Sequence, residues 1–237
     1  MTKSADETSR LQSIYEARRY DVDPAYCDTD PVYLQRVQSI ERAALRVLAQ
    51  VGLSNRLGEL DVLDFGCGNG KWFGRWLAWG AMPERLVGID ARPEALALAR
   101  HRFPVSRFIE SDPYQLPFED ERFDVVSQNI VFSSILDREG RSTCADELCR
   151  VLRPGGILLW CDLAFNNPKN PDVKAVTVRE LRTLFPRLEP VRIDRLVLAP
   201  PLARQVVPSS WLAAQILEHT LPFVRTHLHA GLRKPAR

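Results

Sequence analysis

The sequence predicts an α/β protein built on a mostly parallel sheet with helices on both faces. Short apolar segments of strand character alternate with longer segments of helical period from residue 61 onward. Such alternation is typical of parallel strands joined by right-handed helical crossovers. In addition, three glycines spaced Gly66-x-Gly68-x-Gly70 follow the first apolar segment and precede a helix-compatible segment. Strand, glycine turn and helix in this order are typical of a nucleotide-binding α/β unit.

Length and composition restrict the class of protein. A chain of 237 residues suits one domain with an elaboration, or a small pair of domains. Its 45% hydrophobic and 26% charged residues are ordinary for a globular protein. The net charge of +2 is too small to indicate nucleic acid or a membrane surface as a partner. We therefore expect no nucleic-acid partner.

Five cysteines without a Cys-x-x-Cys pair indicate reduced thiols, and hence a cytoplasmic location. The same pattern argues against a zinc site. The first ten residues are polar and charged, without the apolar region of a signal peptide. No apolar run reaches the roughly 20 residues that a membrane-spanning helix needs, so we expect no membrane span.

The first 55 residues are expected to form an N-terminal helical cap or lid. Residues 11–20 have a helical pattern of apolar side chains. A second helix is predicted to begin after Asp30, which can cap it, with Pro31 at its first position. Its apolar positions fit the helical period until Gly52, where we expect it to end.

Residues 56–237 are expected to form the ligand-binding domain. Its first half begins with the apolar strand 61–65 and the helix 70–79 that follows the glycine turn. The apolar strand 85–89 leads into the helix 93–102, whose proline at position 93 suits a first turn. A short third strand is expected at 106–109.

The second half continues the alternation. Strand 124–128, helix 140–152 and strand 157–161 come first, and the C-terminal part follows with further elements. We expect an insert at about 199–224 that borders an acceptor site. The remaining predicted elements are helix 178–185, strand 191–198, helix 210–221 and strand 225–233.

Polar side chains occur where the predicted strands end. In an open α/β sheet, ligands bind beyond the carboxyl ends of the strands. Five polar residues lie at or just past those ends, and we expect them near one binding site: Asp64, Asp90, Asp112, Asn129 and Asp162.

The spacing of the glycines argues against a dinucleotide. A dinucleotide fingerprint needs Gly-x-Gly-x-x-Gly, but here the third glycine comes one residue early and Lys71 takes its place. Asp64 inside the strand end is a poor neighbour for an anionic ligand. It suits a cationic group such as an amino group or a sulfonium, so a dehydrogenase is disfavoured.

The run from Asp64 to Gly70 resembles motif I of the class I S-adenosylmethionine (SAM) methyltransferases, whose pattern is strand-Asp/Glu-x-Gly-x-Gly-x-Gly. Three further segments occur in the family's order, ending with the helix-to-turn signature at 147–156. The resemblance covers residues 60–162. It implies a Rossmann-like sheet of seven strands with the last strand antiparallel, and SAM as cofactor with S-adenosylhomocysteine as product.

Several residues are expected to bind SAM. The Asp90 carboxylate can accept both ribose hydroxyls, as an adenosine site requires. The resemblance implies that Asp112 accepts a hydrogen bond from the adenine amino group, although it could also only begin a turn. Asn129 could contact the methionine part or be structural. The expected set is Asp64, Gly66, Cys67, Gly68, Gly70, Asp90, Ala91, Ser111, Asp112, Pro113 and Asn129.

Two residues are candidates for the catalytic base that an oxygen acceptor can require. Because an antiparallel last strand begins at the ligand edge, His227 should lie near the acceptor, although a structural histidine is the more ordinary interpretation of such a residue taken alone. Asp162 is a comparable candidate. The histidine that many family members carry after strand four is replaced here by Ser133 and Ser134. No cluster of metal ligands is recognisable.

The leading hypothesis is a SAM-dependent methyltransferase that acts on an oxygen of a small-molecule or glycan acceptor. The absence of an Asn-Pro-Pro-Tyr motif disfavours the classes that methylate amides and adenine nitrogen. One alternative is an RNA or protein methyltransferase, which the weak charge disfavours. Another is a SAM-binding protein without catalysis. The oligomeric state, monomer or homodimer, stays open.

Overall fold

The computed structural model describes residue 10, residues 27–167 and residues 170–236. The helix predicted at 11–20 lies outside the described residues. Among those that are described, no helix is long and apolar enough to cross a membrane.

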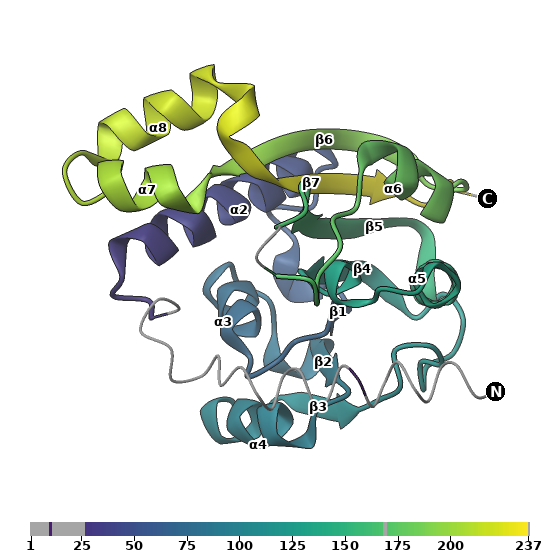
Figure 1. Ribbon diagram of the computed structural model, residues 1–237. Coiled ribbons are helices and arrows are strands. Elements are labelled where there is room, and N and C mark those ends of the chain that lie inside the picture. The colour runs from purple at the N-terminus through teal and green to yellow at the C-terminus, as the bar shows by residue number, and fades with distance from the viewer. Residues whose placement is uncertain (1–9, 11–26, 168–169, 237) are drawn as a thin grey trace.

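A seven-stranded sheet forms the centre of the molecule (Figure 1). Its strand order is β3-β2-β1-β4-β5-β7-β6. All neighbouring pairs are parallel except those of β7, which is antiparallel to both β5 and β6. The predicted fold class is thus confirmed. The strands are β1 (Val62–Phe65), β2 (Leu86–Asp90), β3 (Arg107–Glu110), β4 (Phe123–Asn129), β5 (Leu152–Leu163), β6 (Glu189–Leu198) and β7 (Arg225–Arg233).

Helices cover both faces of this sheet. Alternate strand residues point to opposite faces, and they join two different apolar clusters. Leu63 and Phe65 pack with α5 and α6, whereas Val62 packs with α2, α3 and α4. The helices of the described residues are α2 (Pro31–Gln50), α3 (Lys71–Ala78), α4 (Pro93–Arg102), α5 (Arg138–Val151), α6 (Val178–Leu184), α7 (Pro200–Val206) and α8 (Trp211–Thr220).

The predicted start of α2 is confirmed. Its packing against the sheet was not predicted from the sequence. The Asp30 side chain accepts a hydrogen bond from the Tyr33 backbone N–H, and Pro31 opens the helix. The helix packs across β6 and β7 at one end of the sheet. A Cβ atom at Gly231 would lie 2.3 Å from Val47 Cγ1, so glycine in β7 permits this close approach. The predicted division into a cap at 1–55 and a binding domain stays a prediction.

Two boundaries and one element differ from the sequence-based expectation. The helix predicted at 140–152 begins earlier, because the Asp137 side chain accepts the Gly140 N–H and caps it. Strand β5 begins at Leu152, which pairs with Phe123 before a shift in register. Helix α7 was not predicted. It begins at the Pro200 pair and lies against α2 and α8 (Figure 1).

Candidate functional site

The glycine loop joins β1 to α3 at the carboxyl edge of the sheet. Gly66, Gly68 and Gly70 have φ angles of 70°, 54° and 80°, in the left-handed region that other residues rarely adopt. A Cβ atom at Gly66 would lie 2.4 Å from Cγ2 of Val131, which belongs to the segment after β4. The loop therefore needs glycine both for its backbone conformation and for its packing.

Asp90, at the end of β2, binds this loop directly. Its Oδ2 atom accepts a hydrogen bond from the Gly68 backbone N–H at 2.8 Å. The Cys67 N–H also donates to the Ile89 carbonyl oxygen, at 2.9 Å. The glycine loop and the carboxylate predicted for ribose thus lie side by side. Burial raises the pKa of the Cys67 thiol far above its ordinary value, so this cysteine is an unreactive packing residue.

Arg92 is a residue of this site that the sequence analysis missed. Its guanidinium group binds Asp90, with Nε 2.9 Å from Oδ1 and one terminal nitrogen 3.2 Å from Oδ2. Its backbone N–H also donates to Oδ1 at 3.0 Å. The only sequence signal was a basic residue two positions after the acid. Any hydroxyl group that binds Asp90 must share the carboxylate with Arg92 or displace it.

Asp64 lies at the end of β1 and is almost fully buried. Ser127 Oγ donates to its Oδ1 at 3.0 Å and in turn accepts from Trp76 Nε1 at 3.1 Å. Its Oδ2 atom is buried and has no hydrogen-bond partner among the described residues. Burial raises the pKa of Asp64 to about 7, with the charge of Asp90 adding to the effect. A cationic group that donates to Oδ2 would stabilise the ionised form.

Substitution of Asp64 by Asn should change the dependence of stability on pH. The folded protein holds a proton on Asp64 up to about pH 7, whereas the unfolded chain loses it near the ordinary pKa of 3.8. The Asp64 contribution to the free energy of unfolding is therefore complete below about pH 4 and lost as pH rises through 7. Asp64→Asn should show a flatter decline across this window in urea titrations without ligand. Parallel curves for variant and wild type would contradict the raised pKa.

The segment after β3 carries the residues predicted for adenine. Ser111 donates its backbone N–H to the Asp90 carbonyl oxygen at 3.1 Å, which places this segment beside the glycine loop. Asp112 Oδ1 accepts the Tyr114 backbone N–H at 2.9 Å, so Asp112 does begin a turn. Ala91 follows Asp90 in the chain, and Pro113 follows Asp112. The other carboxylate oxygen of Asp112, Oδ2, is not used in this turn and could accept a hydrogen bond from a ligand. The adenine role of Asp112 stays a prediction.

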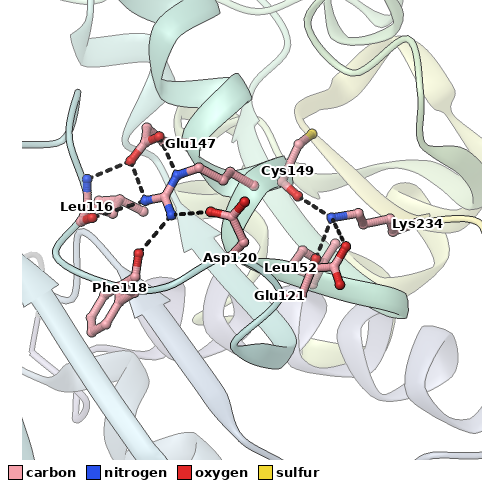
Figure 2. Close-up of polar contacts among 9 residues, drawn as sticks. Leu116, Phe118, Asp120, Glu121, Glu147, Cys149, Leu152 and Lys234 are labelled. Atoms are coloured by element: carbon pink, nitrogen blue, oxygen red, sulfur yellow. Dashed lines mark hydrogen bonds and ion pairs between the residues drawn. The ribbon is translucent and has the colours of Figure 1, made fainter.

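A polar network holds the rest of that segment (Figure 2). The Arg150 guanidinium group pairs with Glu147, at 2.7 and 2.8 Å, and with Asp120, at 2.9 Å. It also donates to the carbonyl oxygens of Leu116 and Phe118, while Glu147 accepts the Leu116 N–H. Helix α5 therefore anchors the loop beyond Asp112. This explains in physical terms the glutamate and arginine of the signature at 147–156.

Asn129 ends β4 at the same edge. Its side chain makes no hydrogen bond to another described residue and is half-buried, so the amide is available to a ligand. The next residue, Ile130, has a φ of 59°, which is an outlier for a β-branched side chain. Strained backbone of this kind occurs preferentially at functional sites. The role of Asn129 itself stays a prediction.

Asp162 and His227 are close in the sheet but face opposite sides. Asp162 pairs with Leu228 and His227 pairs with Leu163 in the antiparallel register of β5 and β7. Adjacent residues on a strand point to opposite faces, so these two side chains cannot act on one atom together. Asp162 is fully buried and accepts the Ser133 backbone N–H at 3.1 Å. Burial raises the pKa of Asp162 to about 6.

His227 lies on the face that α2 covers. Thr226 Oγ1 is 3.0 Å from its Nδ1 and 3.2 Å from the Val197 carbonyl oxygen, which can only accept. Since the threonine hydroxyl has one proton, it donates to Val197 and accepts from Nδ1. The Nε2 atom then carries the lone pair, and it is buried without a partner among the described residues. Burial lowers the pKa of His227 well below its ordinary value, so the ring is neutral.

No three His, Cys, Asp or Glu side chains in the described part of the chain lie close enough to hold a metal ion.

Comparison with known proteins gives methyltransferases among the relatives. Residues 63–160 match the family model described as a methyltransferase domain. A phthiotriol/phenolphthiotriol dimycocerosates methyltransferase of Mycobacterium tuberculosis is 33% identical over 164 residues, which are 66% of this chain and 59% of that protein. A fatty-acid O-methyltransferase of Mycolicibacterium smegmatis is 28% identical over 170 residues, 68% of this chain and 61% of that protein. The chain thus spans about three fifths of the length of these curated relatives.

One solved structure matches nearly the whole chain. It is the 1,6-didemethyltoxoflavin-N1-methyltransferase of Burkholderia thailandensis, with bound 1,6-didemethyltoxoflavin and S-adenosylhomocysteine. The TM-score is 0.68 at 20% identity, and the match covers 99% of this chain and 92% of that one. At this identity the likeness shows the shared fold.

Proposed function

We propose that the chain is a class I SAM-dependent methyltransferase that transfers the methyl group of SAM to an oxygen atom of a small-molecule or glycan acceptor. The observation that carries the proposal is the hydrogen bond from the Gly68 backbone N–H of the glycine loop to the Asp90 carboxylate. This pairing provides a backbone that a ligand can approach closely, next to an acceptor for ribose hydroxyls.

The residues present fit SAM and its charge. The buried, unpartnered Oδ2 atom of Asp64 suits the amino group or the sulfonium of the methionine part. Asp90 would take the ribose hydroxyls after Arg92 moves aside, and Asp112 the adenine amino group. SAM supplies an electrophilic methyl group and leaves as S-adenosylhomocysteine. The full set of residues that we propose around it is Asp64, Gly66, Cys67, Gly68, Gly70, Asp90, Ala91, Ser111, Asp112, Pro113 and Asn129.

An oxygen acceptor is supported by the relatives, because one is named a fatty-acid O-methyltransferase. The protein's main task in such a reaction is to hold the acceptor oxygen in line with the methyl group and to exclude water. We propose that the insert at 199–224 and the N-terminal residues 1–55 enclose the acceptor. We also propose a cytoplasmic location, which the five cysteines support.

His227 is the better candidate for the base that removes the acceptor proton. Its ring is neutral, and its Nε2 lone pair has no partner among the described residues, so Nε2 can accept a proton. Asp162 instead holds the backbone of Ser133, and we assign it a positioning role.

His227→Gln should therefore lower kcat by about 100-fold or more, within the usual range for loss of a general base, while the Kd for SAM stays unchanged. The wild-type rate should be flat above about pH 6.5, because the lowered pKa keeps the ring neutral there. His229→Gln is the matched control, since His229 is also buried, on the same face of β7, with a pKa that burial lowers to about 4. Equal losses of kcat in the two variants would show that His227 acts only in packing.

The test of the function is transfer of labelled methyl from SAM by the purified protein into fractions of a lysate of the source organism. Label in the small-molecule or polysaccharide fraction would support the proposal and identify the acceptor. Label in RNA or protein would replace it with the alternative acceptor class. No label in any fraction, with SAM binding measured separately, would favour a SAM-binding protein without catalysis. Asp90→Ala serves as the negative control. Gel filtration distinguishes monomer from homodimer.

A further inference from the structure

A cavity lies at the far end of the sheet, between α2, β6 and α8. Its volume is about 160 Å³. Four arginines line it, two from α2 and one each from β6 and β7: Arg42, Arg46, Arg192 and Arg225. Only two carboxylates, Asp194 and Glu218, lie on the same wall, so its charged lining is net positive.

Both of those carboxylates are already engaged. Asp194 pairs with Arg192, its neighbour two residues earlier on β6. Glu218 is buried and accepts hydrogen bonds from Gln35, from Ser39 Oγ at 2.9 Å and from the Val197 backbone N–H at 3.1 Å. The buried carboxylate thereby joins α8 to α2 and holds the strained backbone of Val197, whose φ is 67°. These donors are all neutral, and Glu218 makes no ion pair with any of the four described arginines of the cavity.

Three of the arginines have no carboxylate partner among the described residues. Arg42 donates to Ser39 Oγ at 3.1 Å. Arg225 donates to the backbone carbonyl oxygens of Glu218 and His219, at the end of α8, and to that of Arg195 on β6 at 3.4 Å. Arg46 is exposed at the rim and makes no hydrogen bond or ion pair with another described residue. Like charges gathered around one cavity repel each other, and an anion bound among them would remove this repulsion.

Size and geometry restrict what such an anion can be. A volume of about 160 Å³ is below the roughly 300 Å³ at which pockets for drug-sized ligands begin. It suits a single compact oxyanion. Guanidinium groups match the oxygens of phosphate in two-point hydrogen bonds. The exposed rim leaves room for the rest of a larger molecule outside.

This cavity is separate from the glycine loop. Strand β6 is the outermost strand, and β4, β5 and β7 stand between it and β1. Four strand spacings of about 4.8 Å place the two sites roughly 19 Å apart. The anion in question is therefore not a part of the cofactor held at Asp90.

We propose that this arginine cavity binds a phosphate group, either of a small soluble molecule or of a lipid headgroup. Arg42, Arg46 and Arg225 supply the charge, and Arg192 with Asp194 forms the fixed outer wall. The proposal does not depend on methyl transfer, because anion binding here requires neither SAM nor turnover.

Calorimetric titration of the full-length protein with inorganic phosphate, at pH 7 and low ionic strength, tests the site. Arg46→Gln should weaken binding about tenfold, the typical effect of losing one charge-assisted hydrogen bond. Arg182→Gln is the matched control, because it removes the same charge from an exposed position on α6, on the opposite face of the sheet. The Kd for SAM should be the same in all three proteins.

Vesicles distinguish the two sources of phosphate. Binding to phosphatidylcholine vesicles that contain phosphatidic acid, lost in Arg46→Gln, would support a lipid headgroup. Phosphate binding without vesicle binding would support a soluble molecule. The proposal would be overturned by an equal Kd for phosphate in the wild type and both variants, by no phosphate binding at all, or by a parallel loss of SAM binding in Arg46→Gln.

Discussion

Asp90→Ala is expected to lower the affinity for SAM by about 100-fold, the largest effect of any single carboxylate in the site. The substitution removes the acceptor for two ribose hydroxyls. Hydrogen bonds to a charged group contribute about 1.5–3 kcal/mol each, and two at the lower limit correspond to roughly 100-fold. The substitution also removes the hydrogen bond that Asp90 Oδ2 accepts from the Gly68 N–H, so the loss of affinity includes the loss of this support for the glycine loop. Isothermal titration with SAM measures it.

Glu110→Ala is the control for this experiment. Glu110 lies opposite Asp90 in the register of β2 and β3, at the same edge, but it is exposed. The control variant loses an equal charge without losing a contact to the loop, so its Kd for SAM should stay within about twofold of the wild type, as expected for a solvent-screened charge. If Asp90→Ala binds SAM as tightly as Glu110→Ala does, the ribose role of Asp90 is wrong.

Gly66→Ala is expected to destabilise the protein and to abolish tight SAM binding. Two separate effects add at this position. Left-handed backbone costs a non-glycine residue about 1–2 kcal/mol, and Gly66 has a φ of 70°. The new Cβ would also lie 2.4 Å from Val131 Cγ2, and overpacking of this kind costs about 1–3 kcal/mol. Together these costs predict a fall in Tm of roughly 4–20 °C for a chain of this size.

Two further variants separate the effects. Gly52 has nearly the same φ, 75°, but open space where a Cβ atom would be placed. Gly52→Ala therefore reports the backbone cost alone, and its Tm should fall less than that of Gly66→Ala. In the double variant Gly66→Ala, Val131→Ala the clashing methyl group is removed, and SAM affinity should partly return. An equal fall in Tm for the two glycine variants would show that Val131 does not restrict the loop.

The sequence by itself determined most of the architecture, because the signals for it are local. Apolar strands followed by helical segments indicated the parallel sheet, and the glycine spacing indicated the turn after β1. Asp30 and Pro31 marked the start of α2 since capping involves only residues within one turn. The carboxyl-edge location of Asp64, Asp90 and Asn129 also followed, because parallel strands all end at the same edge.

What tertiary structure alone decided were the contacts between residues far apart in the chain. Such contacts depend on strand register, on the face to which each side chain points and on how closely a helix approaches, none of which local periodicity records. The register of β5 and β7 separated Asp162 from His227, which the sequence had offered as equal candidates. The packing of α2 on β6 and β7 created the arginine cavity from four positions that no motif connects. The sequence thus located the cofactor loop, and only the folded chain showed which side chains meet around it.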